Sequence, residues 1–330
     1  MRRCLMRPAL LVLGLLLGTT SPAAQQAGSS IDRTPRTPWG HPDLQGIWST
    51  ATITPFERPT DLAGKEFLTA QEAADFERRT VETANRDRRG GSAEADVAGA
   101  YNEFWFDRGT KVVPTRRTAL VIDPPDGRIP AMTPEAQIRL NGEAATRKAR
   151  GPADNPEDFS LWVRCIVRGV PTVMLPQGYN GNYRIHQTPD YVVIVAEMIH
   201  EARIIPLDGR PHLPPTMRQW TGDPVGRWEG DTLVVETTNF SEKAAYRGTT
   251  ASLRLVERFT RTAPDVLLYR VTIDDPATFT RPWTVELPVT PTDGEIYEYA
   301  CHEANYSLAD MLRGARAQEK KAADAAKKTP

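Results

Sequence analysis

The sequence lacks the short motifs that identify several common enzyme classes. It has no Gly-x-Ser-x-Gly elbow, no phosphate-binding loop, no dinucleotide-binding fingerprint and no set of kinase motifs. It also has no excess of basic residues, with 41 Lys and Arg against 42 Asp and Glu. These absences argue against nucleotide chemistry, standard serine hydrolysis and a nucleic-acid partner, and we expect no cofactor.

Long hydrophobic runs are also missing. The longest clearly apolar run, residues 9–18, covers about half of the roughly 20 residues that a membrane-spanning helix needs. Arg2, Arg3 and Arg7 precede it and small residues follow at 21–24, which is the order found in a secretory signal peptide.

The organisation expected along the chain follows from this leader. Residues 1–24 are predicted to be a signal peptide, 25–43 an extended lead-in, 44–310 a single β-rich domain with a helical N-terminal half, and 311–330 a frayed tail. Removing the leader makes the formal net charge of −1 three units more negative. We expect a periplasmic or secreted protein with no stable membrane anchor after cleavage.

Cysteine is scarce, with three residues in the chain. Cys165 and Cys301 remain after cleavage of the leader, which contains Cys4. An even number in an oxidising compartment favours one disulfide, and two buried free thiols are the alternative. A metal site that uses both cysteines would be unusual, because neither belongs to a Cys-x-x-Cys pair.

Three segments carry helix signals. Thr69 and Glu72 form a capping-box pattern at the start of 69–88, and Thr133-Pro134 opens a second helix that extends to about residue 148. A third, shorter helix is expected over 156–167.

Elsewhere the hydrophobic period is two, as in strands. The fold class expected is mostly β, an antiparallel meander that forms a barrel or a curved sheet with two or three peripheral helices. The strands are expected at residues 44–49, 118–123, 191–207, 232–238, 253–261, 266–274, 279–287 and 295–302.

Two charged residues fall on faces that are otherwise apolar. In a strand, Glu257 shares a side with Leu255 and Phe259, and Arg281 shares a side with Trp283. An isolated charge in an apolar interior is costly, so the two would pair with each other or line a ligand pocket inside the sheet. An edge position that faces water remains a further alternative.

A second group of polar residues lies at 197–203. As a strand, this segment places His200 on an apolar face and Glu197 and Arg203 on the other. His200 with a nearby carboxylate is the best candidate for a general acid or base, although a satisfied core histidine is the alternative. As a helix, Glu197 and His200 would form one Glu-x-x-His pair, but a di-metal site needs two copies.

A third group surrounds Cys301. His302 and Glu303 either tie the last strand to the body of the protein or lie at the mouth of the same sheet. Trp220 is a candidate for stacking on a flat ligand, although most tryptophans belong to cores. The histidine spacings match no compact metal signature, so we predict no metal ligands.

Two resemblances follow from short stretches of sequence. Gly46-Ile47-Trp48 resembles the Gly-x-Trp opening of lipocalin-like (calycin) barrels, in which the tryptophan closes one end of the barrel. More broadly, the chain is similar to a large, uncharacterised family of exported bacterial proteins, which implies export and a single structural unit but no particular reaction. The stretches that carry this second resemblance are residues 42–48, 123–128, 203–210, 226–232 and 299–303.

The functional expectation is an exported enzyme that processes a small molecule in a pocket of the sheet, as a hydrolase, lyase or isomerase using acid/base chemistry. His200, Glu197, Glu257 and His302 are its candidate catalytic residues, and Arg203, Arg281, Trp220 and Glu303 are its candidate substrate contacts. The alternatives are a non-catalytic, lipocalin-like ligand-binding module and a structural or interaction protein.

Overall fold

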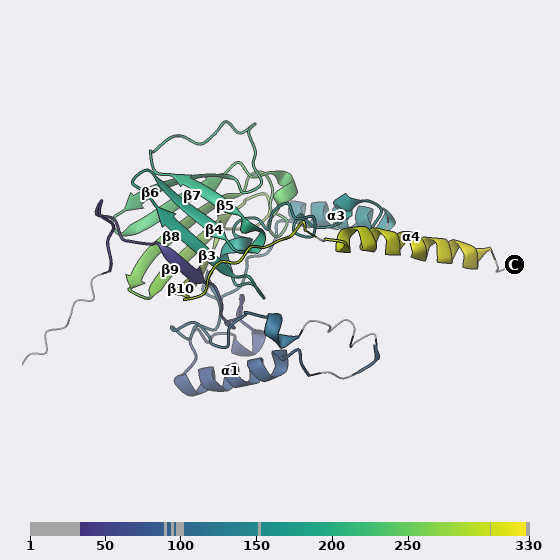
Figure 1. Ribbon diagram of the computed structural model, residues 1–330, viewed down its shortest axis with the longest axis horizontal. Helices are drawn as coiled ribbons and strands as arrows, with labels where there is room; N and C mark the ends of the chain where they lie inside the picture. Colours follow the sequence, from purple (N-terminus) through teal and green to yellow (C-terminus); the bar gives the residue numbers. More distant parts are fainter. Residues whose placement is uncertain are drawn as a thin grey trace, which may run out of the picture. The chain divides into compact units, whose positions relative to one another are not determined.

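The central element is a ten-stranded antiparallel sheet that nearly closes into a barrel (Figure 1). The computed structural model describes residues 34–88, 91–93, 96, 102–150, 153–303 and 305–327, so the expected signal peptide and part of the lead-in lie outside the described residues. The strands are β1 (Gly46–Ser49), β2 (Val121–Asp123), β3 (Asn182–Gln187), β4 (Tyr191–Ala196), β5 (Ala202–Pro206), β6 (Asp223–Glu229), β7 (Thr232–Thr238), β8 (Arg254–Ala263), β9 (Val266–Asp274) and β10 (Trp283–Pro291).

Most strands pair with their neighbours in the sequence, and β1 joins the two runs of strands. Along the sheet it runs β5-β4-β3-β1-β10-β9-β8-β7-β6, and β2 pairs with β10 beside this path. Because β1 pairs with both β3 and β10, the first and last strands are joined, and the two ends of the sheet are β5 and β6. The predicted antiparallel meander is therefore confirmed.

The seam between β5 and β6 is packed by side chains. Gly226 in β6 lies so close to Ile205 and Leu207 that an added Cβ would meet their side-chain carbons at 2.8 and 2.7 Å. A Cβ at this position would force these side chains to shift, whereas glycine allows the approach. Gly226 therefore lets the two end strands come together where the ladder of backbone hydrogen bonds is interrupted.

Local sequence explains the adjacent hairpin. Glu229 pairs with Thr232 across a two-residue loop, and Gly230, the first loop residue, has a φ of +59°. Glycine adopts this conformation without steric cost, as tight hairpins require. The strand predicted at 232–238 is found as β7.

Large side chains fill the interior. Trp48 is 1% exposed, its indole nitrogen donates to the Leu44 carbonyl at 2.9 Å, and the Arg261 guanidinium lies 5.4 Å from its ring centre. Four other large aromatic side chains are fully buried, namely Tyr183, Phe259, Tyr269 and Trp283. Close packing of this kind leaves little room in a barrel of modest size.

Among the described residues, three α-helices accompany the sheet: α1 (Ala70–Ala84), α3 (Pro134–Arg150) and α4 (Ser307–Ala326). The capping box of α1 is present, because the Thr69 hydroxyl accepts from the Glu72 amide and the Glu72 carboxylate accepts from the Thr69 amide. The helix expected over 156–167 is reduced to the 3-10 turn η3 (Pro156–Asp158) followed by turns. The tail expected to fray is helical in α4, where Ala, Lys, Glu and Arg are strong helix formers.

The expected strand boundaries need three corrections. The segment 191–207 is broken after β4 by the 3-10 turn η5 (Met198–His200), with a φ of +59° at Ile199, so strand alternation does not extend to His200. Strand β10 begins only at Trp283, so Arg281 precedes it. Residues 295–302 form no strand, and strands β3 and β6 were not predicted.

A buried ion pair crosses the barrel interior. Arg203 in β5 donates from Nη1 and Nη2 to the two carboxylate oxygens of Glu257 in β8, at 2.9 and 2.5 Å. The Tyr269 hydroxyl donates to Glu257 Oε1 at 2.9 Å. Burial lowers the pKa of Arg203, but the Glu257 carboxylate more than offsets this, so the pKa of Arg203 is raised. The pair expected between Glu257 and Arg281 is therefore wrong, because Arg281 pairs with Asp123 in solvent.

Removing Arg203 should be far more damaging than removing Arg281. We expect Arg203→Met to lower the free energy of unfolding by about 3–5 kcal/mol, because it leaves Glu257 buried without its cation. Arg281→Met removes an exposed pair and should cost at most about 1 kcal/mol. Urea unfolding of both variants measures this, and equal losses would contradict a structural role for the Arg203–Glu257 pair.

Candidate functional site

The eight candidate residues from the sequence do not share one pocket. Glu257 and Arg203 come together, but they bind each other inside the barrel and line none of the three pockets described below. Arg281 and Trp220 are exposed and also absent from these pocket linings. Strand alternation correctly placed Glu257 on an inward face. Its buried charge is neutralised by Arg203, which lies on another strand.

The turn after β4 separates Glu197 from His200. Glu197 is 3% exposed and its carboxylate accepts from the Asn182 side chain at 2.8 Å, whereas His200 is exposed. Burial raises the pKa of Asp107, and the neighbouring Glu197 carboxylate adds to this effect. The Glu197 carboxylate therefore lies close enough to Asp107 for the two charges to repel each other, and the sequence patterns did not indicate this pair.

The segment after β10 contributes one predicted residue to a pocket. Glu303 lines a pocket of about 540 Å³, next to Cys301 and Tyr299, while His302 is exposed and is not in its lining. Trp162 and Asn180 also line this pocket. We name this space the acidic pocket, since Glu298 and Glu303 are its charged residues.

Trp162 also lines a second pocket, of about 270 Å³. Its charged residues are Arg168 and Lys243, so we name it the basic pocket. The Arg168 guanidinium lies 4.4 Å from the centre of the Trp162 ring, a cation–π contact. Trp162 therefore belongs to two neighbouring pockets of opposite charge, which we call together the Trp162 site.

A disulfide holds the two chain segments of this site together. Cys165 and Cys301 are bonded, with an S–S distance of 2.02 Å and a Cα–Cα distance of 5.7 Å, which confirms the predicted pair. On one side of the bond lies the turn that carries Trp162, and on the other lies the segment that carries Glu303. The covalent link keeps the walls of the acidic pocket close to each other.

Two buried polar side chains fix the turn that presents Arg168. The Glu201 Oε2 atom accepts from the backbone amides of Arg168 and Gly169, at 3.0 and 3.1 Å. Gly169 has a φ of +83°, which favours glycine there. Gln177 Oε1 accepts from Nε and Nη2 of Arg168 at 3.3 and 3.2 Å. The direction of the guanidinium is therefore set by groups beneath the pocket.

Burial shifts the pKa values of both charged residues at this turn, Glu201 and Arg168. Burial raises the pKa of Glu201 above its ordinary value, against the opposing effect of the Gly169 and Arg168 amides and of Arg203. Its Oε1 atom is buried and has no hydrogen-bond partner among the described residues. Burial also lowers the pKa of Arg168, which nevertheless remains charged near neutral pH.

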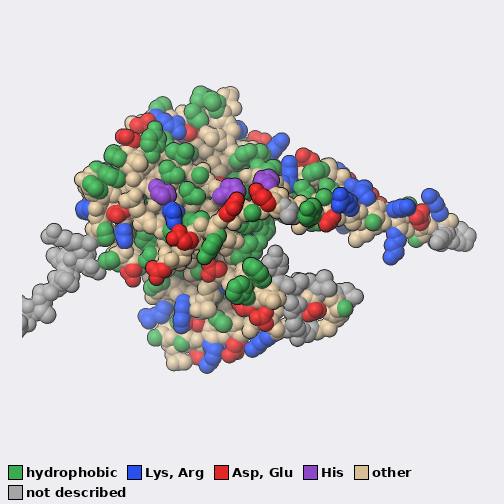
Figure 2. All heavy atoms as spheres, in the orientation of Figure 1, with side chains coloured by type: hydrophobic (Ala, Val, Ile, Leu, Met, Phe, Trp, Pro, Cys, Tyr) green, Lys and Arg blue, Asp and Glu red, His purple; other side chains and the backbone are tan. Residues whose placement is uncertain are grey.

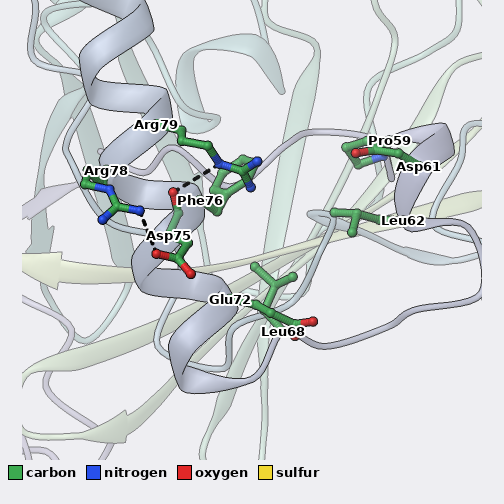
Figure 3. Close-up of a pocket in the computed structure, with 9 residues that line it drawn as sticks. All are labelled: Pro59, Asp61, Leu62, Leu68, Glu72, Asp75, Phe76, Arg78 and Arg79. Carbon is green, nitrogen blue, oxygen red and sulfur yellow. Dashed lines mark hydrogen bonds and ion pairs between the residues drawn. The ribbon is translucent and has the colours of Figure 1, made fainter.

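The largest of the described pockets, about 650 Å³, lies beside α1 (Figure 3). In Figure 3 the dashed lines from Arg78 and Arg79 both end on Asp75. The Lys65 ammonium lowers the pKa of Glu72 to about 2, and the Thr69 amide and hydroxyl add to this effect. The charges of Asp75, Arg78 and Glu72 therefore stabilise helix α1.

One histidine–carboxylate pair was missed by the sequence patterns. His212 Nδ1 lies 3.0 Å from Asp223 Oδ2, and its Nε2 lies 3.7 Å from Glu236. Asp223 also accepts from Arg210 and from the Leu213 amide. The pKa of Asp223 is lowered by these bonds, although burial acts against them. This network ties down the long loop between β5 and β6.

On the face shown in Figure 2, acidic and basic side chains are interspersed and collect into no large patch of one sign. The described residues include no group of three or more His, Cys, Asp or Glu that could hold a metal ion. Over the same part of the chain, no helix is long and apolar enough to cross a membrane. Comparison with protein-family models, curated proteins and solved structures gives no match.

Glu201→Gln should change how stability depends on pH. The folded-state pKa of Glu201 is raised, so its contribution to stability is fully present below pH 4.5 and is lost as the pH rises through the folded-state value. A glutamine does not ionise and avoids this loss. In urea unfolding between about pH 4 and pH 7, Glu201→Gln should therefore gain stability relative to the native chain as the pH increases. If the stabilities of the variant and the native chain changed with pH in parallel, the raised pKa of buried Glu201 would be contradicted.

Proposed function

We propose that the protein binds a small molecule at the Trp162 site, outside the barrel. The observation that carries this proposal is that Trp162 lines both pockets while a disulfide holds the walls of the acidic pocket together. An aromatic side chain with a few convergent polar groups is typical of ligand sites. The site is also rigid, since Val173 and Met174, which follow the Arg168 turn, are buried in the core.

The packed interior supports a site outside the barrel. A lipocalin-like module would hold its ligand among the strands, where Glu257, Arg203 and Tyr269 bind one another here. The calycin resemblance therefore remains a proposal about Trp48, which is buried against Leu44 and Arg261, and it does not extend to the ligand site.

We also propose that the protein acts after export. The disulfide between Cys165 and Cys301 fits an oxidising compartment, and the leader pattern of residues 1–24 fits a periplasmic or secreted protein.

Acid/base catalysis is the second candidate function, and Glu201 is the observation that favours it. Burial raises the pKa of Glu201, and a raised pKa is the direction that favours a carboxyl group as a general acid or base. Glu201 contacts the amides of Arg168 and Gly169, two residues of the basic pocket. A hydrolase, lyase or isomerase at the Trp162 site would thus use Glu201 in place of the four residues expected from the sequence.

A thermal-shift screen tests the binding proposal. We expect at least one compound from a panel of sugars, lipids, neutral aromatics and aromatic acids to raise the melting temperature, with or without a chelator. Trp162→Ala should abolish that increase, because it removes the wall shared by both pockets. Trp220→Ala, a substitution at an exposed tryptophan outside both linings, is the matched control. An increase that survives Trp162→Ala and disappears with Trp220→Ala would overturn the proposal.

A further inference from the structure

The charged side chains that line the basic pocket are all positive. Its lining contains Arg168 and Lys243 and no aspartate or glutamate. The remainder is apolar or carries a hydroxyl group, with Leu161, Trp162 and Val167 beside Ser160, Thr172 and the alanines that follow Lys243. A small pocket with two cations and an aromatic wall selects for negative charge on a flat apolar body.

The Arg168 guanidinium is incompletely satisfied. It is half-buried, and its Nε and Nη2 atoms donate to the neutral Gln177 side chain. Among the described residues, its Nη1 atom has no hydrogen-bond partner and no carboxylate pairs with the group. Its other contacts are the neutral Gln177 side chain and the face of the Trp162 ring, so a ligand anion would supply the negative charge that this half-buried cation lacks.

The Glu201 carboxylate, which contacts the backbone of this turn, does not pair with the guanidinium. Glu201 directs Oε2 at the backbone amides of Arg168 and Gly169, and it is 9% exposed. Its position therefore orients the Arg168 turn without pairing with the guanidinium. The charge presented to the pocket remains positive.

Lys243 supplies the second cation from another part of the chain. It belongs to the 3-10 turn η6 (Glu242–Ala244), which is capped by the Ser241 hydroxyl. Its side chain is exposed and forms no ion pair within the described residues. The two cations of the basic pocket thus come from two loops, each fixed by its own hydrogen bonds.

We propose that the basic pocket binds the acidic group of a small aromatic anion, with Arg168 and Lys243 on the anionic group and Trp162 against the ring. The inference rests on the proposed function and specifies the ligand class for that site. A carboxylate and a phosphonate share the required chemistry, because the guanidinium and the ammonium bind oxygen atoms of either group.

Titration calorimetry with the full chain tests the inference. The probes are benzoate, phenylphosphonate and the neutral benzamide, so that anionic charge is varied on one ring. We expect at least one anion to bind more tightly than benzamide. Arg168→Gln should weaken anion binding roughly tenfold to hundredfold, as expected for a lost hydrogen bond to a charged group. Lys243→Gln should weaken it by a smaller factor, since the ammonium is exposed.

The matched control is Arg164→Gln. Arg164 lies in the same turn, pairs with Glu157 at 3.4 Å and lines neither pocket, so this variant should bind the anions as the native chain does. If Arg168→Gln fails to fold, Lys243→Gln and the comparison of anion with benzamide still test the role of charge.

The outcomes separate the two proposals. Equal binding of benzamide and the anions, abolished by Trp162→Ala, would overturn the anion inference and leave the proposed function in place. Tighter anion binding that Arg164→Gln weakens as much as Arg168→Gln does would also overturn the inference. Absence of binding by all three probes would overturn it as well, whereas the broader screen with Trp162→Ala decides the proposed function.

Discussion

The ion pair between Arg203 and Glu257 is the interaction on which the rest of this structure depends. The sheet closes only partly, because the seam between β5 and β6 is packed by side chains around Gly226. Arg203 lies on β5 at one side of that seam, and Glu257 lies on β8 beyond the other side. Their bidentate contact, to which the Tyr269 hydroxyl adds a hydrogen bond, links β5 to β8 through the barrel interior. These side chains fill that part of the interior.

The same strand connects the interior to the Trp162 site. Glu201 precedes Arg203 by two residues, and both are buried. Fixing Arg203 to Glu257 therefore also fixes Glu201, whose carboxylate holds the Arg168 and Gly169 amides. The disulfide fixes the other end of this turn. A half-buried guanidinium over Trp162 is thus positioned by one covalent bond and a chain of buried polar contacts.

Period-two alternation and turn residues were enough to predict the fold class and two strands at their observed bounds, β7 and β9. Alternation also identified Glu257 as an inward charge, but its partner depends on which strands face each other across the barrel, and spacing along the chain does not encode that. The placement of His200 on a strand face was wrong, because Ile199 adopts a positive φ that strand alternation does not reveal. Arg168 gave no periodic signal, since it lies in a turn whose geometry is set by the distant Glu201 and Cys301.

The central claim is that ligands bind at Trp162, outside the barrel, while the interior is structural. NMR of the indole N–H groups in the full chain tests it most directly, because the 7 tryptophans include Trp162 at the site and Trp48 and Trp283 in the core. Each signal can be assigned by substituting one tryptophan with phenylalanine. On titration with a ligand that raises the melting temperature, the Trp162 signal should shift first while the Trp48 and Trp283 signals stay in place. Early shifts of Trp48 or Trp283 with an unchanged Trp162 signal would contradict the account.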